Sequence, residues 1–371
     1  MLDQPVFIGS EIYRHSTYGR QHPLAIPRVS TVMDLCRALG WLTPQSYRVS
    51  PRAKPEALMA FHTPDYIAAL QAAERAQAVS DSVRDRYGLG TLSNPVFPEM
   101  YRRPATSAGG SMLAAELIRD GGIVYNPAGG THHGMADRAN GFCYLNDPVL
   151  AIRTLLNAGL SRIVYVDIDA HHCDGVEAAF HGSAEVRMIS VHEARRWPFT
   201  GALSDDAGGA AWNLPVARNL NDIEFDAILD QLILPVTQDF DPQAIVLQCG
   251  ADAVAEDPLS RLTLSNNAHW RAVAQLKPLA PRFLVLGGGG YNPWSVGRLW
   301  SGVWATLNGY EIPDKLNSDA QSVLRALSWN RAAGRQPPAH WFDTLRDQPN
   351  EGPVRSELKA DLHKLAARNS R

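Results

Sequence analysis

The sequence predicts an α/β fold with a central parallel sheet, flanking helices and long active-site loops at the carboxyl ends of the strands. Short apolar runs alternate with helix-like stretches, and the runs show little polar alternation, as in strands buried on both faces. The 29 glycines and 25 prolines gather just after these runs. Alternation of this kind predicts helices on both faces of a parallel sheet, which binds ligands at the carboxyl ends of its strands.

Six strands are expected, at Val6–Gly9, Ile123–Tyr125, Arg162–Asp169, Val186–His192, Ala244–Gln248 and Arg282–Leu286. The helix-like stretches are Val29–Leu39, Pro104–Arg119, Asp147–Ala158, Asp222–Asp239 and Leu264–Lys277. Neither a repeat nor a linker divides them, so we predict one domain over residues 1–328. From about Trp329 the chain becomes polar and Pro-rich and ends in a helix near Ser356–Ala367. We expect residues 329–371 to form an extension packed on, or trailing from, the same domain.

The composition is that of a globular protein, with 371 residues and a formal net charge of −3. This balance gives no electrostatic reason to expect a nucleic acid or an anionic membrane as partner. We find no signal peptide and no apolar run long enough to span a membrane, and therefore expect a cytoplasmic protein. The four cysteines lack a CxxC spacing, which disfavours a disulfide framework or a cysteine-based zinc site.

Several nucleotide-binding and hydrolase motifs are absent or incomplete. The run Gly287–Tyr291 follows a strand, but Asn292 stands where a dinucleotide fingerprint requires its third glycine. The motifs GxxxxGK(S/T), HExxH and GxSxG do not occur. Nucleotide binding, zincin chemistry and an α/β-hydrolase serine are therefore disfavoured.

Three residues of types that commonly bind metals follow apolar strands. Asp169 and His171 lie two residues apart in an extended segment, so that both can face one ion, and Asp252 follows another strand. An Asp/His/Asp set with an open position suits a catalytic divalent metal such as Zn²⁺ or Fe²⁺. Each residue alone is better explained as a helix cap or a solvated loop residue. The three together favour a metal site.

A tandem histidine pair, His132 and His133, lies in a Gly-rich loop beyond a strand. Two imidazoles can serve as general base and acid, and Asp167 and Asp174 are available to fix their tautomers. Tyr291, after four glycines, could donate a hydrogen bond to a developing oxyanion. A surface or metal-binding His pair and a packed tyrosine remain the alternatives for these residues taken singly.

Seven segments together resemble the histone deacetylase superfamily, specifically its class I-like bacterial branch of deacetylase-like and acetoin-utilisation proteins. They span about residues 6 to 310 and are His22–Arg28, Phe61–Tyr66, Asn126–His133, Asn140–Asp147, Tyr165–Phe180, Leu247–Pro258 and Leu286–Tyr291. The resemblance implies an arginase-like α/β fold over the catalytic domain. It also implies a Zn²⁺-dependent amidohydrolase that acts on a linear amide in an acyl-lysine of a protein or peptide.

The resemblance also assigns roles to residues. Asp169, His171 and Asp252 match the zinc ligands, with Fe²⁺ as the alternative metal in the cell. His133, supported by Asp174, matches the main general base and acid; His132, supported by Asp167, matches its electrostatic partner; and Tyr291 matches the carbonyl-polarising phenol. The family's structural K⁺ site corresponds to the backbone around Asp167, Asp169, His171, Ser190 and Val191.

The substrate-binding positions match the family only in part. Gly141 and Phe142 match one tunnel wall, and Arg28 matches the arginine of the internal product cavity. Ser93 stands where class I members usually carry an acidic residue. Trp197 replaces the usual phenylalanine of the opposite wall.

Three rival functions are weighed. A dinuclear ureohydrolase needs a second aspartate where this chain has Cys173, which favours a single metal. An acetylpolyamine amidohydrolase shares the catalytic residues, but its polyamine-selective members carry a Glu where this chain has Leu259. A non-enzymatic acyl-binding regulator is expected to lose a ligand, the His pair or the tyrosine, and none is lost. We therefore predict an acyl-lysine deacetylase or deacylase, with a polyamine amidohydrolase as the alternative.

Overall fold

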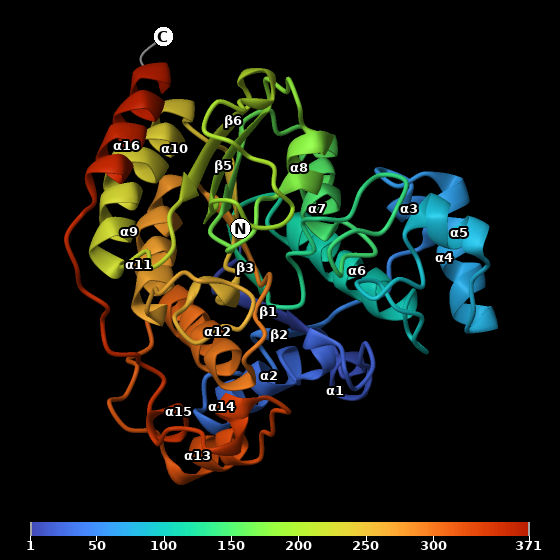
Figure 1. Cartoon of the computed structure of the whole chain (residues 1–371), viewed down its shortest axis with the longest axis horizontal. Coiled ribbons are helices and arrows are strands. Elements are labelled where there is room, and N and C mark those ends of the chain that lie inside the picture. Colours follow the sequence, from blue (N-terminus) through green and yellow to red (C-terminus); the bar gives the residue numbers. More distant parts are fainter. Residues whose placement is uncertain (1, 370–371) are drawn as a thin grey trace.

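Eight strands form one sheet in which every neighbouring pair is parallel (Figure 1). The computed structural model describes residues 2–369, so residues 1, 370 and 371 of the two predicted ranges lie outside the described residues. The strand order is β2-β1-β3-β8-β7-β4-β5-β6. The strands are β1 Val6–Gly9, β2 Tyr47–Val49, β3 Gly122–Asn126, β4 Ile163–Asp167, β5 Val186–Glu193, β6 Ala211–Val216, β7 Ala244–Gln248 and β8 Arg282–Leu286. The predicted fold class is confirmed.

The two strands absent from the sequence prediction, β2 and β6, are the edges of the sheet. β2 has only three residues and is largely exposed. β6 contains Pro215, which argues against a central strand but is tolerated at an edge, where one row of backbone groups has no partner strand. β2 is too exposed to carry the apolar signal used for the six other strands, and β6, although mostly buried, is interrupted by Asn213 and Pro215.

Helices cover both faces of the sheet (Figure 1). Their buried side chains form two large apolar clusters with those of the strands. One face packs against α2 Val29–Ala38, α9 Asp222–Ile228, α11 Asn266–Leu276, α12 Pro293–Asn308 and α16 Ser356–Asn369. The other packs against α6 Arg102–Leu117, α7 Asp147–Asn157 and α8 Asp174–Ala179. A third cluster lies around α4 Pro64–Ala76 and includes Tyr291. The remaining helices are α1 Ile12–His15, α3 Pro55–Leu58, α5 Asp81–Tyr87, α10 Leu234–Phe240, α13 Ser318–Arg325, α14 Ala332–Arg335 and α15 His340–Asp343.

The predicted helix over 222–239 is interrupted. A π-helical turn at Leu229–Ile233 separates α9 from α10. Pro235 lies in the first turn of α10; it has no N–H, and its ring crowds the carbonyl of the preceding turn. A widened turn is one way in which a helix accommodates such a residue.

The segment after residue 329 packs on the main body. Trp341, Leu345, Leu358, Leu362 and Leu365 are buried in the same cluster as α11 and α12. Arg355 forms an ion pair with the buried Glu224 of α9. Figure 1 shows α16 running beside α9 and α10. The boundary at residue 328 stays a prediction.

None of the described helices combines the length and apolar character that crossing a bilayer requires.

Candidate metal centre and its surroundings

The candidate site lies at the carboxyl ends of neighbouring central strands. The chain leaving β4 carries Asp169 and His171, and the chain leaving β7 carries Asp252. The loop after β3 carries the His pair, and the chain leaving β8 carries Tyr291. All these strands are parallel, so their carboxyl ends lie at one edge of the sheet. The sheet therefore gathers side chains that are far apart in the sequence.

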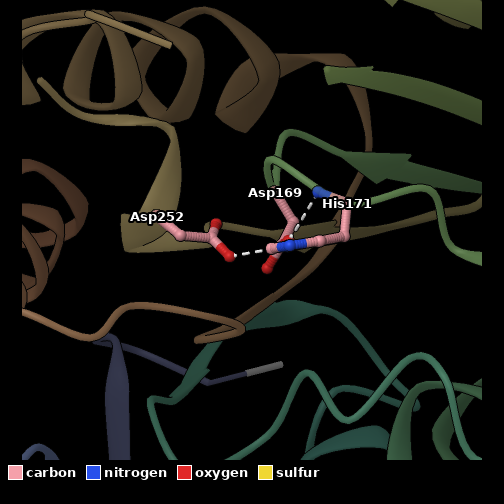
Figure 2. Close-up of side chains that lie close together, drawn as sticks. All are labelled: Asp169, His171 and Asp252. Carbon is pink, nitrogen blue, oxygen red and sulfur yellow. Dashed lines mark hydrogen bonds and ion pairs between the residues drawn. The ribbon is translucent and has the colours of Figure 1, made fainter. Parts of the chain in front are cut away.

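Asp169, His171 and Asp252 converge as predicted (Figure 2). One ligand atom from each lies within 4.8 Å of the others. The Nδ1 atom of His171 is 2.9 Å from Oδ2 of Asp252 and 3.2 Å from Oδ1 of Asp169. Both carboxylates are almost fully buried, at 1% and 0% exposure. The three residues form a candidate site for one metal ion.

Backbone amides hold the two carboxylates in place. The N–H of Gly289 donates to Oδ2 of Asp169 at 2.7 Å, and the N–H of Ala170 donates to Oδ1 of Asp252 at 3.0 Å. Glycine is required where these chains meet: a Cβ on Gly289 would lie 2.1 Å from Oδ2 of Asp252, and one on Gly250 would lie 2.2 Å from Oδ2 of Asp169. Close backbone approach fixes the carboxylates before any ion binds.

The donor set fits a divalent cation. Burial, and then the charge of Asp169, raises the pKa of Asp252, because two carboxylates share a space from which water is excluded. A cation between them relieves that repulsion. Two carboxylate oxygens and one imidazole nitrogen, with the remaining positions open, form a set that suits Zn²⁺ or Fe²⁺.

The histidine pair lies beside the candidate ligands, and each imidazole has its own carboxylate. Nδ1 of His132 is 2.7 Å from Oδ2 of Asp167, and Nδ1 of His133 is 2.6 Å from Oδ1 of Asp174. The two Nε2 atoms are 2.9 Å apart. Both imidazoles line the same inner cavity as Asp169 and His171. These contacts are the pairings that the resemblance to the family implies.

The two imidazoles differ in their affinity for a proton. Burial alone would lower the pKa of His132, but Asp167 and Asp169 outweigh it and raise the pKa to about 9. Burial, and then the positive charge of His132, lowers the pKa of His133 to about 4. The pair therefore holds its proton on His132 and leaves His133 neutral near pH 7. A neutral imidazole whose Nδ1–H is bound to a carboxylate can accept a proton at Nε2.

Other polar side chains, for which no role was predicted from the sequence, support this arrangement. The hydroxyl of Tyr165 lies 2.6 Å from Oδ2 of Asp167 and 2.9 Å from Oε1 of Gln248, within hydrogen-bond distance of both. Asn140 donates to Asp174 at 3.0 Å. Asp147 accepts from the N–H groups of Gly130 and Thr131 and so fixes the histidine loop. A polar residue in an apolar strand, as Gln248 is in β7, is the signal that could have identified part of this set.

Tyr291 and the predicted tunnel walls line the cavities that lead to the candidate metal site. Tyr291 lines both the inner cavity and an outer cavity of about 440 Å³. Burial raises the pKa of Tyr291 well above its usual value, so the phenol keeps its proton. Trp197 packs edge-on to His133, with ring centroids 4.6 Å apart, and Phe142 packs in the same manner on Tyr291 at 5.8 Å. Gly141 leaves room for the Trp197 ring, which a Cβ would meet at 2.1 Å.

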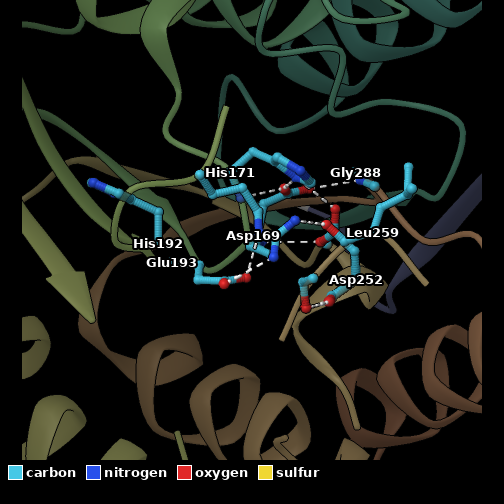
Figure 3. Close-up of polar contacts among 12 residues, drawn as sticks. Asp169, His171, His192, Glu193, Asp252, Leu259 and Gly288 are labelled. Carbon is cyan, nitrogen blue, oxygen red and sulfur yellow. Dashed lines mark hydrogen bonds and ion pairs between the residues drawn. The ribbon is translucent and has the colours of Figure 1, made fainter. Parts of the chain in front are cut away.

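The other predicted binding residues divide between the two cavities. Ser93 and Leu259 line the outer cavity together with Gly141, Phe142 and Trp197. Arg28 lines the inner cavity, where it is bonded to the carbonyl of Gly288 at 2.7 Å and has a buried Nε without a hydrogen-bond partner. Figure 3 shows the polar contacts around Gly288, Leu259 and the three candidate ligands.

The residues predicted to surround a K⁺ ion lie at the ends of two paired strands. Asp167 of β4 is in register with Ser190 of β5, and Val191 follows. These residues, together with Asp169 and His171, are buried.

Comparison with known proteins places these features in one family. The family described as "Histone deacetylase domain" matches residues 22–307. Acetoin utilization protein AcuC of Bacillus subtilis is 32% identical, over 90% of this chain and 91% of its own length. Human histone deacetylase 1 is 34% identical over 81% of this chain, which spans 63% of that relative. Several other eukaryotic relatives are likewise matched over only about 60–64% of their length.

The solved structures agree. The crystal structure of an HDAC homolog from Aquifex aeolicus superimposes with a TM-score of 0.93 at 36% identity, over 98% of this chain and 100% of that one. A structure of an HDAC homolog complexed with SAHA matches equally well. The family match covers most of the chain, and the shared fold extends beyond it. The chain therefore belongs to the histone deacetylase family.

Proposed function

We propose that the protein hydrolyses the amide of an acyl-lysine in a protein or peptide. One observation carries the proposal: two histidine–aspartate pairs and a protonated tyrosine lie around an Asp–His–Asp set at the base of a cavity with aromatic walls. This arrangement contains a metal-ligand set, a base and an oxyanion donor within one site. These are the components that hydrolysis without a covalent intermediate requires.

Asp169, His171 and Asp252 would hold the metal, for which we propose Zn²⁺ with Fe²⁺ as the alternative. When bound, such an ion supplies Lewis acidity that polarises a carbonyl and lowers the pKa of water. We also propose K⁺ as a structural ion near Asp167 and Ser190, where the resemblance to the family indicates a backbone site.

The side chains around the metal would each have a separate role in the reaction. His133, neutral and oriented by Asp174, accepts a proton as water attacks the acyl carbonyl and returns it to the departing lysine amine. His132, charged and held by Asp167, stabilises negative charge nearby. The Tyr291 hydroxyl donates to the developing oxyanion, a contribution of roughly 3–4 kcal/mol for one such donor in other enzymes. The rings of Phe142 and Trp197 would enclose the aliphatic part of the lysine.

The same catalytic groups would hydrolyse an acetylpolyamine, so substrate choice depends on the outer cavity. A polyamine carries additional ammonium groups, which a selective site would pair with a carboxylate. Leu259 is apolar, and the residues lining the cavity include Arg195, Arg196 and Arg218 but no carboxylate. An ammonium group here would be desolvated without a partner, which is unfavourable. We therefore propose acyl-lysine over acetylpolyamine.

The test is a side-by-side measurement of kcat/KM with the metal-loaded protein. The substrates are an acetyl-lysine peptide, longer acyl-lysine peptides, N-acetylputrescine and N-acetylspermidine. We expect the lysine peptides to be preferred. A polyamine preference of tenfold or more would support the alternative, and hydrolysis of none of these substrates by protein with stoichiometric metal would favour a non-enzymatic acyl-binding protein.

A further inference from the structure

The mouth of the outer cavity has a one-sided charge. Its lining contains three arginines, Arg195, Arg196 and Arg218, and neither Asp nor Glu. The chain as a whole has a net charge of −3, so this positive cluster does not reflect the overall composition. Ser93 lines the same mouth at the position where the resemblance predicts an acidic residue.

One buried carboxylate, that of Glu193, lies behind these arginines, and it is already bonded to other groups. Glu193 accepts two bonds from the guanidinium of Arg196, whose Nη1 also donates to the carbonyl of Leu259 at 2.7 Å. The N–H of Arg261 donates to Glu193 at 2.8 Å. Glu193 and Leu259 both belong to the polar contacts drawn in Figure 3. The positive charge of Arg196 is therefore balanced by Glu193. Its bond to Leu259 connects the loop that contains Arg196 to the segment that follows Asp252.

Arg195 and Arg218 remain without a matching charge of their own. Arg218 is 72% exposed and reaches Glu193 only at 3.7 Å, where Arg196 already occupies both carboxylate oxygens. Arg195 is exposed, and none of the ion pairs formed within residues 2–369 includes it. Two guanidinium groups therefore face solvent at the entrance of the tunnel, beside the exposed rings of Trp197 and Phe199.

We propose that Arg195 and Arg218 select acyl-lysines that have Asp or Glu close by in the substrate sequence. This inference rests on the proposed acyl-lysine activity and specifies the substrate class. Guanidinium groups pair well with carboxylates, and a peptide whose acyl-lysine fills the tunnel passes over the mouth in both directions. The exposed rings of Trp197 and Phe199 supply apolar contact for the same peptide.

The positive surface is short, which limits the acidic stretch that it recognises. An adjoining cavity of about 800 Å³ shares Arg195 and Arg218 with the mouth, but Glu357 and Asp361 of α16 line it as well. Arg355, also in that cavity, is already paired with Glu224. The surface therefore suits one or two carboxylates next to the lysine and opposes a long polyanion.

The test compares acetyl-lysine peptides that differ only in whether Glu, Gln or Lys flanks the acyl-lysine. For the wild-type holoenzyme we expect kcat/KM to be roughly three- to tenfold higher with Glu than with Gln, the range for two exposed ion pairs, and lowest with Lys. The preference should shrink as salt is raised, because these charges are exposed. The double variant Arg195→Gln/Arg218→Gln should remove the preference, and Arg195→Lys/Arg218→Lys should retain part of it.

The matched control is Arg75→Glu on α4, an exposed arginine outside the residues lining either cavity, which should keep the wild-type ratio. Metal content and melting temperature show that each variant is folded. Peptide binding is measured separately by fluorescence anisotropy on the metal-loaded His133→Ala protein, with the same labelled peptides. This second measurement reports on charge preference even if no peptide is turned over.

The outcomes separate this inference from the proposed function. Equal kcat/KM and equal affinity for Glu- and Gln-flanked peptides would overturn the inference while leaving the hydrolase intact. A Glu preference that survives in the double Gln variant would also overturn it. Absence of turnover together with tighter binding of the Glu peptide would support the charge preference and reject the hydrolase. If dodecaglutamate competes as strongly as the Glu-flanked peptide, the surface binds a long acidic stretch. That result would contradict the inference that it suits only one or two carboxylates.

Discussion

The floor and the mouth of the site are built differently. The floor, consisting of the three candidate metal ligands and the His pair, is buried, and it lies on segments that leave the central strands. The mouth, represented by Arg195, Trp197, Phe199 and Arg218, lies on loops, and the rings of Trp197 and Phe199 are 37% and 73% exposed. Floor side chains have several fixed hydrogen bonds, whereas Arg195 has none with a described carboxylate.

This difference indicates which properties each region determines. A floor fixed by buried strands and backbone amides keeps the reacting groups at set distances, which catalysis requires. Loops at the mouth can change charge and shape without disturbing the sheet. The floor supports the proposed reaction, and the mouth supports the proposal about its substrate.

The largest effect is expected at the metal ligands. Asp252→Asn should lose the bound metal and with it more activity than the roughly 10²–10⁴-fold that a general base contributes, because a buried ligand charge is removed. Elemental analysis and turnover of an acetyl-lysine peptide measure both quantities. Asp226→Asn, in a half-exposed pair with Arg271, is the control. Stoichiometric metal in the Asp252 variant, or two metals per wild-type chain after K⁺ is excluded, would contradict a single site with this ligand.

The His pair tests whether the floor has two distinct imidazoles. His133→Ala should lower kcat by about 10²–10⁴-fold and His132→Ala by less, because His133 is the neutral member. Both variants should retain metal. The opposite order of the two kcat values would show that the base has been assigned to the wrong histidine.

Tyr291→Phe removes one hydroxyl at the boundary between floor and mouth. We expect a stably folded, metal-loaded protein whose kcat falls by roughly 10²–10³-fold with little change in KM, since the hydroxyl acts on the transition state. Steady-state kinetics on an acetyl-lysine peptide provide the measurement. A kcat near that of the wild type would mean that Tyr291 is only a packed aromatic.

Beneath the floor, His62 should make stability depend on pH. Its Nε2 accepts from the N–H of Asn146, whose side chain holds the carbonyls of His132 and Gly134, and burial lowers the pKa of His62 to about 4. The unfolded chain, with a pKa near 6.5, binds more protons between these values, so stability is full above about pH 6.5 and falls toward pH 4. His62→Gln should remove about 1.4 kcal/mol per pH unit from that slope. Urea unfolding at a series of pH values gives the slope, and an unchanged slope would contradict this prediction.

The smallest effect is expected at an exposed residue of the mouth. Phe199→Ser should change the free energy of unfolding by less than about 0.5 kcal/mol, because the ring is mainly in solvent. Its effect on kcat/KM for an acetyl-lysine peptide should stay below about fivefold and appear in KM. A large loss of kcat would show that the mouth takes part in the chemistry and would remove the distinction from the floor.

The floor could be predicted from the sequence because its polar residues directly follow the apolar strands in the chain. Asp169 and His171 directly follow a buried apolar run, and a period of two residues sets their common direction. Each imidazole needs an acceptor for its second nitrogen, which made Asp167 and Asp174 candidates. The family resemblance supplied the assignment of one carboxylate to each histidine. The six covered strands carried the same apolar signal and were found with shifts of a few residues at most.

Features that depend on tertiary packing could not be predicted in this way. The buried helix α12 is largely apolar around its circumference and therefore lacks the polar face that marks a surface helix. The interruption between α9 and α10 depends on how the helix accommodates Pro235, and β6 depends on its position at an edge. The positive mouth brings together Arg195 and Arg218 from separate loops, which no local pattern reveals.

The glycines behind the candidate metal ligands limit how this site can vary. Gly250 and Gly289 contact the ligand carboxylates so closely that even alanine would displace them. Two residues without functional groups are thus as constrained as the aspartates that they touch. A deep mutational scan should therefore find that substitutions at Gly250 and Gly289 are tolerated as poorly as substitutions at the candidate ligands, because the site needs the space that a side chain there would fill.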